Sequence, residues 1–168
     1  MKKTLPGLFI LFILFSLTTR AQQPKTPIEL NNYMSGIVAT LYQKGSAWGT
    51  KFVEVKESKN YSELTPLRKD IEKVIAAKQA ELRTIDNIGG SEDFKNALMV
   101  FLKYENTLLQ TFIPFENLTK DSKQEDIDAL YKNLTDQASK ENEVLGNIRK
   151  IQMLYAKRNN FSIETKKD

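Results

Sequence analysis

Apolar residues recur at intervals of three and four positions through most of the chain beyond residue 26. This spacing places them on one face of an α-helix, and no segment shows the apolar–polar alternation of a half-buried strand. Short connections of about 2–8 residues favour antiparallel packing of successive helices. The sequence therefore predicts an all-α, up-down-up-down antiparallel four-helix bundle whose long helices span about residues 27–58, 63–87, 92–118 and 123–159.

Two capping boxes mark expected helix starts. Thr26 precedes Pro27, which suits the first helical position, and Glu29 follows Thr26 at the spacing that a capping box requires. Ser122 and Glu125 repeat that spacing before the last predicted helix. We therefore expect both helices to begin with side chains that bond the free amide groups of the first turn.

Glycine and proline mark the expected helix ends. The Gly89–Gly90 pair should terminate the second helix, because glycine tolerates a left-handed cap, and Ser91 should cap the third. Pro114 should kink or end the third helix, because proline lacks an amide hydrogen. The glycine-containing segment 44–50 is the weakest part of the first helix and a candidate kink.

The predicted third helix carries the most apolar stretch of the chain beyond residue 21. Residues 97–102 are all apolar, so this helix should lie against the core. With that face inward, Met99, Val100 and Ile113 point away and form a candidate surface for a protein partner or a second copy of the chain. A slight rotation of the helix would instead bury all three.

Polar residues interrupt the apolar stripes near the middle of three predicted helices. Counted from the second turn, Lys78 and Glu105 differ in height by only about 6 Å. A buried pair there would fix helix register or bind a small polar ligand. The alternative is that both side chains lie at the stripe edge and extend to water along their stems. The complete candidate layer consists of Lys78, Glu105, Gln137 and Glu141.

Trp48 is the single tryptophan of the chain and lies among small residues, with Gly45 before it and Gly49 after it. One interpretation is that the glycines open a ligand pocket that the indole ring walls. The other is that the glycines allow a neighbouring helix to approach closely, while the indole fills the remaining core space. Trp48 is therefore a candidate ligand-binding residue with an ordinary structural alternative.

Residues 1–21 have the pattern of a secretory signal peptide. Lys2 and Lys3 precede an apolar run at 8–17, and the small residues Thr19 and Ala21 lie at the −3 and −1 positions of the expected cleavage site before Gln22. The run is shorter than the roughly 20 residues that cross a membrane. We expect an exported single domain at 22–168, with no membrane span after cleavage and no lipid anchor through cysteine, because the chain has none.

Removing that leader changes the charge balance. The full chain has 25 basic and 21 acidic residues, and Lys2, Lys3 and Arg20 lie in the leader. The remainder has 22 basic residues against 21 acidic ones, a net charge of +1. Such a balance lacks the positive surface that binds phosphate backbones, so we expect no nucleic-acid partner.

The chain contains no His and no Cys. These absences exclude Ser-His-Asp and Cys-His nucleophile systems, His-ligated haem and the usual zinc ligand sets. The acidic cluster at 121–128 lacks the glycine that an EF-hand loop needs at its sixth position. We expect no catalytic residue, no cofactor and no metal site, and a protein that is not an enzyme. An enzyme without His or Cys would need carboxylates or a lysine such as Lys78 as its acid/base group.

Short signatures near both ends of the predicted bundle carry a resemblance. They are Asn32-Tyr33 in the first helix and, closing the fourth, Gln152-x-x-Tyr155 followed directly by the segment 156–161, Ala-Lys-Arg-Asn-Asn-Phe. With the leader, they resemble an uncharacterised family of exported bacterial helical-bundle proteins, often labelled surface proteins. The resemblance implies a Gram-negative periplasm or cell surface, and it supplies no activity and no functional residues.

These observations lead to two functional expectations. The first is a non-enzymatic protein-interaction or structural module of the bacterial periplasm or cell surface, with an unknown protein partner or a second copy bound at its surface. The alternative is a small-ligand-binding bundle that uses Lys78, Glu105 and Glu141 near Trp48.

Overall fold

The computed structural model describes residues 23–163, which fold into four long helices and two short ones, with no strand in that range. The all-α four-helix bundle predicted from the sequence is confirmed. The expected signal peptide lies outside the described residues. The helical elements are α1 (Pro27–Ser58), η1 (Tyr61–Glu63), α2 (Leu64–Thr84), α3 (Glu92–Gln110), α4 (Ile113–Glu116) and α5 (Gln124–Arg158).

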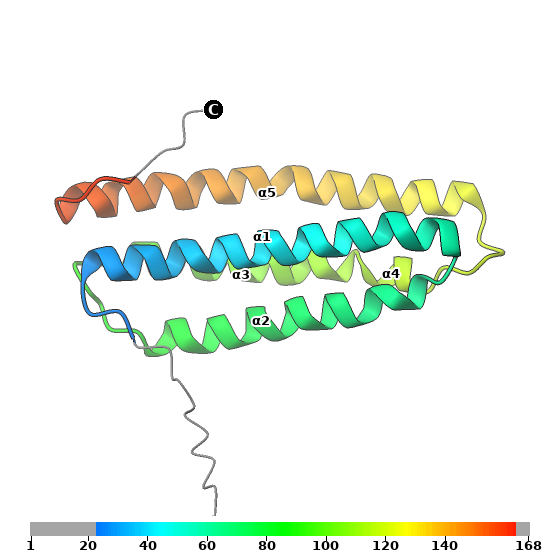
Figure 1. The fold of residues 1–168 in the computed structure, drawn as a ribbon. Coiled ribbons are helices and arrows are strands. Elements are labelled where there is room, and N and C mark those ends of the chain that lie inside the picture. The colour runs from blue at the N-terminus through cyan, green and yellow to red at the C-terminus, as the bar shows by residue number, and fades with distance from the viewer. Residues whose placement is uncertain (1–22, 164–168) are drawn as a thin grey trace, which may run out of the picture.

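The four long helices lie side by side, and the chain reverses direction at each connection between them (Figure 1). Contacts join α1 to α2, α2 to α3 and α3 to α5, and a smaller contact between α1 and α5 closes the ring. In the part of the chain that the structure describes, none of these helices has the length and apolar character needed to cross a lipid bilayer.

The start of α1 agrees with the sequence. The Thr26 hydroxyl accepts from the Glu29 amide at 3.3 Å, and the Glu29 carboxylate accepts from the Thr26 amide in return, which completes the capping box. α1 continues as one unbroken helix through the candidate kink at 44–50 to Ser58. Lys59 ends the helix in the left-handed conformation, with its amide bonded to the Val55 carbonyl at 2.8 Å.

Three expected caps differ from the structure. α2 ends at Thr84, before Gly89–Gly90, so the glycine pair lies in the connection instead of at the helix end. Ser91 is at the N-cap position of α3 as expected, but its hydroxyl donates to the Asn87 side chain at 3.3 Å and makes no capping bond to the first turn of the helix. Ser122 accepts from the Thr119 amide, a competing turn that moves the start of α5 beyond it.

Gly89 and Gly90 are needed in that connection for another reason. Both have positive φ, and a Cβ atom at Gly89 would lie 2.3 Å from the Asn159 side-chain oxygen. The close approach allows the Asn159 amide to donate to the Gly89 carbonyl at 3.0 Å, while Tyr155 donates to the Ile88 carbonyl. The end of α5 is thereby fixed to the connection between α2 and α3.

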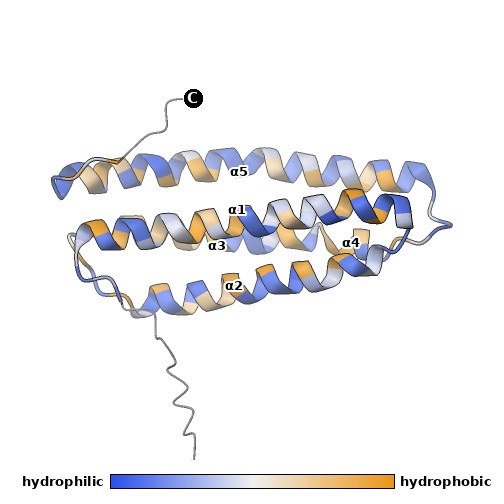
Figure 2. Cartoon of the chain, in the orientation of Figure 1, coloured by the Kyte–Doolittle hydropathy of each residue, from blue (hydrophilic) through white to orange (hydrophobic). Residues whose placement is uncertain are grey.

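The apolar bands of the helices meet in one continuous core, with hydrophilic bands between them along each helix (Figure 2). α1, α2 and α3 supply most of this core. Within α5, all of which is described, the middle of the helix has no buried residue. The buried residues of α5 are Ile127 near one end and Ile148, Tyr155 and Ala156 toward the other. The central part of α5 is therefore held to the core less closely than its ends.

α3 stops at Gln110, and the chain turns through Thr111 before the single turn of α4. The Thr111 hydroxyl donates to the Leu108 carbonyl at 2.6 Å, and Pro114 cannot donate to continue the earlier ladder. The sequence expectation that Pro114 kinks or ends this helix is confirmed. The break separates the predicted helix 92–118 into two pieces.

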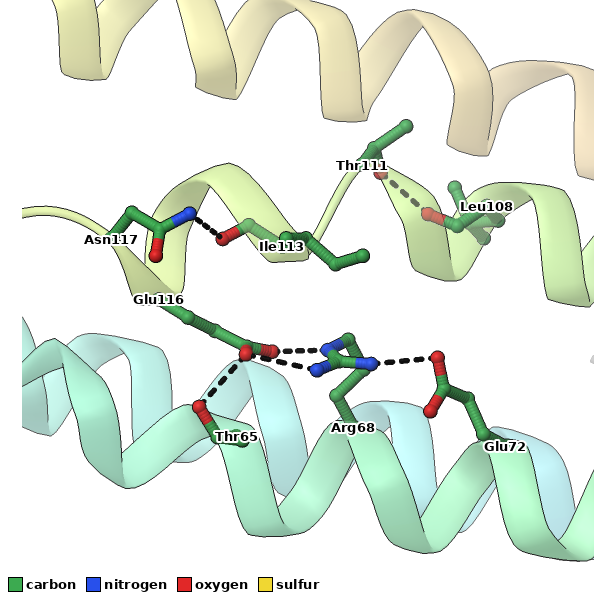
Figure 3. A network of polar contacts seen from close by, with 8 residues as sticks. All are labelled: Thr65, Arg68, Glu72, Leu108, Thr111, Ile113, Glu116 and Asn117. Carbon is green, nitrogen blue, oxygen red and sulfur yellow. Dashed lines mark hydrogen bonds and ion pairs between the residues drawn. The ribbon is translucent and has the colours of Figure 1, made fainter.

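A buried ion pair holds α4 against α2 (Figure 3). The Arg68 guanidinium bonds both carboxylate oxygens of Glu116, including Nη2 to Oε2 at 3.1 Å, and bonds Glu72 at 2.6 Å. The Thr65 hydroxyl donates to the same Glu116 carboxylate at 2.8 Å. Because every strong acceptor of Glu116 is engaged, α4 has a defined position relative to α2.

Candidate functional site

A cavity of about 460 Å³ lies between α1, α3 and α5, beside the central part of α5. Most of its lining is apolar, and it reaches the surface near Tyr42, whose side chain is 78% exposed. α2 contributes only Ile71 to the wall. The lining from α1 includes Val38, Leu41, Gly45, Ser46, Trp48 and Gly49, that from α3 and the following turn includes Phe101, Glu105, Leu108, Leu109 and Phe112, and that from α5 includes Tyr131, Leu134, Thr135, Ala138, Glu141 and Leu145.

Gly45 and Gly49 leave one wall of this cavity without side chains. A Cβ atom built at either position would meet nothing within 4 Å. The structural alternative is therefore wrong about the close approach of a neighbouring helix at these glycines, but it is right that the indole fills core space, because Trp48 is 3% exposed and packs in the core. Both glycines line the cavity instead, as the pocket interpretation of the Trp48 region requires.

Trp48 forms the aromatic wall at one end of the cavity. Its ring stacks on Phe112 with centroids 4.0 Å apart and on Phe52 with centroids 5.5 Å apart. Phe115 of α4 packs edge-on against the same indole at 5.9 Å. The break after α3 therefore positions this wall. The indole Nε1 is buried and has no hydrogen-bond partner among the described residues.

Glu105 of α3 and Glu141 of α5 bring two carboxyl groups together at the cavity. Glu105 is 9% exposed, and its Oε1 has no hydrogen-bond partner in the described part of the chain. Burial, together with the charge of Glu141, raises the pKa of Glu105 from 4.5 to about 8. Burial also raises the pKa of Glu141. The nearby Glu141 carboxyl favours the protonated form of Glu105, because two like charges repel each other at short distance.

Tyr104 fixes the height of α5 beside this pair. Its phenol donates to the main-chain carbonyl of Gln137, one turn before Glu141. Burial and the two nearby carboxyl groups, Glu141 and then Glu105, raise the pKa of Tyr104. The phenol therefore stays protonated and keeps this bond at neutral pH.

The structure brings three of the predicted ligand-binding residues together and leaves two apart. Trp48, Glu105 and Glu141 line the cavity, whereas Lys78 and Gln137 do not. The expected Lys78–Glu105 pair is not formed: Lys78 bonds Glu81 at 2.7 Å, on its own helix, and its Nζ lies 5.2 Å from the centroid of the Tyr33 ring. Gln137 contributes only its main-chain carbonyl, to Tyr104.

The three predicted partner-surface residues also separate. Val100 is 54% exposed, while Met99 and Ile113 are half-buried. Met99 packs against the core, as the rotated-helix alternative expects. Val100 lines a second groove of about 390 Å³ between α3 and α5, together with the exposed Leu154.

Two tyrosines at the mouth of the cavity were missed by the sequence reasoning. Tyr42 and Tyr131 both line it while remaining exposed, and Tyr131 stacks on Phe52 with centroids 6.4 Å apart. Their spacing carried a usable signal, because each precedes a cavity residue, Gly45 or Leu134, by three positions on its helix. Over residues 23–163, no group of three carboxylates is arranged to hold a metal ion.

Comparisons of the chain with protein-family models, curated proteins and solved structures find no match. The resemblance to exported helical-bundle proteins therefore stays a prediction. The cavity and the residues that line it are therefore the features that indicate function.

Proposed function

We propose that this protein is an exported four-helix bundle that binds a small, largely apolar organic molecule in the cavity between α1, α3 and α5. The observation that carries the proposal is the buried Glu105 carboxyl group, which lines a mainly apolar cavity and whose Oε1 has no hydrogen-bond partner among the described residues. The leader-like sequence at 1–21 supports export.

The dimensions and lining of the cavity support this proposal. Ligand pockets in proteins measure about 300–1,000 Å³ and are mainly apolar, with a few polar groups that orient the ligand. The volume of about 460 Å³ lies in that range. The polar groups here are few and come from different helices, Ser46 and Thr135 in addition to the carboxyl pair.

The residues that keep the cavity open also favour binding over incidental loose packing. Gly45 and Gly49 lie in the interior of a long helix, where glycine costs about 0.5–1 kcal/mol relative to alanine. Alanine would fit at both positions without a clash. Their presence therefore costs the helix stability and leaves space beside Trp48, an arrangement that a ligand-binding wall explains.

The test fills the cavity from the glycine wall. Gly45→Leu places a side chain in the cavity, whereas Gly36→Leu is the matched control, on the same helix but outside the cavity lining. The probe is the neutral fluorescent compound N-phenylnaphthylamine. Saturable binding of one molecule per chain should occur in the wild type and in Gly36→Leu and should be lost in Gly45→Leu. Equal binding by both variants, or no saturable binding by the wild type, would contradict the proposal.

A second candidate function is binding of a protein partner or a second copy at the groove between α3 and α5. Exposed Val100 and Leu154, both on this groove, favour it. Light scattering on the purified protein tests the homodimer: a rise in mass with concentration that Leu154→Lys abolishes supports it. A monomer at all concentrations counts against it.

A further inference from the structure

The carboxyl pair points to the chemical class of the ligand. We infer that the cavity takes an amphiphilic organic amine, with its ammonium group against Glu105 and Glu141 and its apolar body along the Trp48 wall. This inference rests on the proposed function, because it requires that the cavity is a binding site.

The ionisable carboxyl groups that line the cavity are not balanced by a basic side chain in the lining. The described lining contains two acidic residues and neither Lys nor Arg. The nearest lysines of α1 are bonded elsewhere: Lys44 pairs with Asp70 of α2, and Lys51 pairs with Glu54 at 2.5 Å. An anionic head group would therefore meet two carboxyl groups without a compensating cation, whereas a cationic one would neutralise them.

The pair also lacks a donor that an ammonium group supplies. Glu105 is nine-tenths buried, and its Oε1 accepts no bond from the described residues. A carboxylate left without partners in a buried site is costly, and a charge-assisted bond from an N–H group removes that cost. A primary ammonium has three such donors, so it can bond both carboxyl groups at once.

The two carboxyl groups come from different helices, and a separate contact holds them opposite each other. The Tyr104 phenol is bonded to the Gln137 carbonyl, which fixes α5 against α3 one turn from Glu141. Any ligand that bonds both carboxyl groups therefore bridges α3 and α5. This is the region where α5 has no buried residue of its own.

The aromatic lining suits the rest of an amine ligand. Trp48 contributes part of its buried indole to the cavity wall, and the Tyr42 and Tyr131 rings stand at the mouth of the cavity. Aromatic faces attract cations as well as apolar groups. An alkyl or aryl amine can therefore enter past the tyrosines and place its apolar body against the indole.

Proton release gives the inference a second, independent signature. The other titratable groups nearby are the phenol of Tyr104, which lies close to both carboxyl groups, and the phenols of Tyr42 and Tyr131, which line the same cavity. Burial raises the pKa of Glu105 to about 8, so an ammonium group that binds the ionised pair at neutral pH must displace a proton. Amine affinity should then rise with pH up to about 9 and fall only when the amine itself deprotonates, near the range of lysine.

The experiment compares octylamine, octanol and octanoate, which share an alkyl chain and differ in the head group. Isothermal calorimetry and the fluorescence of Trp48, the single tryptophan, measure binding to the full-length mature chain at about pH 6 to about pH 9. Octylamine should bind at least about tenfold more tightly than octanol, and octanoate most weakly. The preference for octylamine should disappear in Glu105→Gln/Glu141→Gln and persist in Glu143→Gln, a control at an exposed α5 position.

Each outcome decides a different point. Equal binding of octylamine and octanol would overturn the amine inference and leave the proposed function standing. Tighter binding of octanoate would overturn the inference outright. Absence of binding for all three would contradict both. Octanol binding by the double variant would show that its cavity is intact. If the double variant does not fold, Glu141→Gln alone is tested, and it must lower the affinity for octylamine while leaving the affinity for octanol unchanged.

Discussion

Trp48 of α1 stacks on Phe112, the residue that precedes α4, with ring centroids 4.0 Å apart and an interplanar angle of 26°. The contact exists because α3 ends early and the chain turns before Pro114. The Arg68–Glu116 ion pair then holds α4 in place. One end of the cavity wall therefore depends on an ion pair that does not line the cavity.

Breaking that ion pair should destabilise the protein and disturb Trp48. Arg68→Met leaves the Glu116 carboxylate, whose side chain is only 7% exposed, without its main partner. Removing one member of a buried pair costs about 3–5 kcal/mol. Urea unfolding should show a loss of that size, and the native Trp48 fluorescence should change because Phe112 shifts with α4.

The matched control is Lys132→Met, which breaks the exposed Lys132–Asp136 pair on α5. Exposed pairs contribute at most about 1 kcal/mol, so this variant should unfold almost as the wild type does. Arg68→Met/Glu116→Leu should recover part of the lost stability. If Arg68→Met and Lys132→Met are equally stable, the buried pair does not hold α4.

The stability of Glu105→Gln relative to the wild type should increase as the pH rises. The pKa of Glu105 is raised in the folded state from 4.5 to about 8, so the wild type has this group's full stabilisation below 4.5 and loses it as the pH rises toward 8. Glutamine does not titrate. The free energy of unfolding of the variant minus that of the wild type should increase by roughly 2–4 kcal/mol across this interval.

Chemical denaturation of both proteins at a series of pH values measures that difference. Glu143→Gln, at an exposed position of α5, is the control and should follow the wild-type pH profile. A pH-independent difference for Glu105→Gln would mean that the pKa of Glu105 is the same in the folded and the unfolded protein.

Gly49→Ala should stabilise the protein. Gly49 lies inside α1, and the added Cβ would meet nothing within 4 Å, so the helix gains the usual alanine preference of about 1 kcal/mol. The melting temperature should rise by about 2–4 °C for a chain of this size. Gly89→Ala is the contrasting variant and should lower it, because Gly89 has φ +58° and a Cβ there would meet Asn159. A loss of stability in Gly49→Ala would show that the wall is closely packed.

Thr26→Ala should destabilise the protein, since the Thr26 side chain caps α1. Loss of an N-cap costs about 1 kcal/mol, commonly within 0.5–2 kcal/mol. Ser122→Ala is the control, because Ser122 bonds the Thr119 amide of the exposed turn and does not cap α5. Thermal unfolding should separate the two variants, and an equal loss would indicate that Ser122 acts as a cap after all.

Much of the local structure could be predicted because it depends on neighbouring residues. The Thr26 capping box, the early end of α3 before Pro114 and the helical spacing of apolar residues all follow from hydrogen bonds within a few positions. Prediction failed where two local alternatives competed. Ser122 could cap α5 or close the turn at Thr119, and only the folded chain selects the turn.

The candidate site was predicted only in part, because its residues meet across helices. Glu105 and Glu141 interrupted apolar stripes and were identified for that reason, but Lys78 was paired with Glu105 from its height along the helix alone. The height of a residue along the helix axis does not give its direction around that axis, because successive residues differ by about 100°. Lys78 points toward Glu81 and Tyr33. The rotation of each helix depends on packing against all of its neighbours.

By itself the sequence determined the all-helical character of the described residues, the bounds of α1 and the absence of His and Cys chemistry, because composition and short-range periodicity are local properties. Only the tertiary structure decided that Glu105 faces Glu141, that Gly45 and Gly49 border open space, and that a cavity lies beside the middle of α5. Those features arise from the relative rotation and separation of whole helices, which the sum of many distant contacts determines.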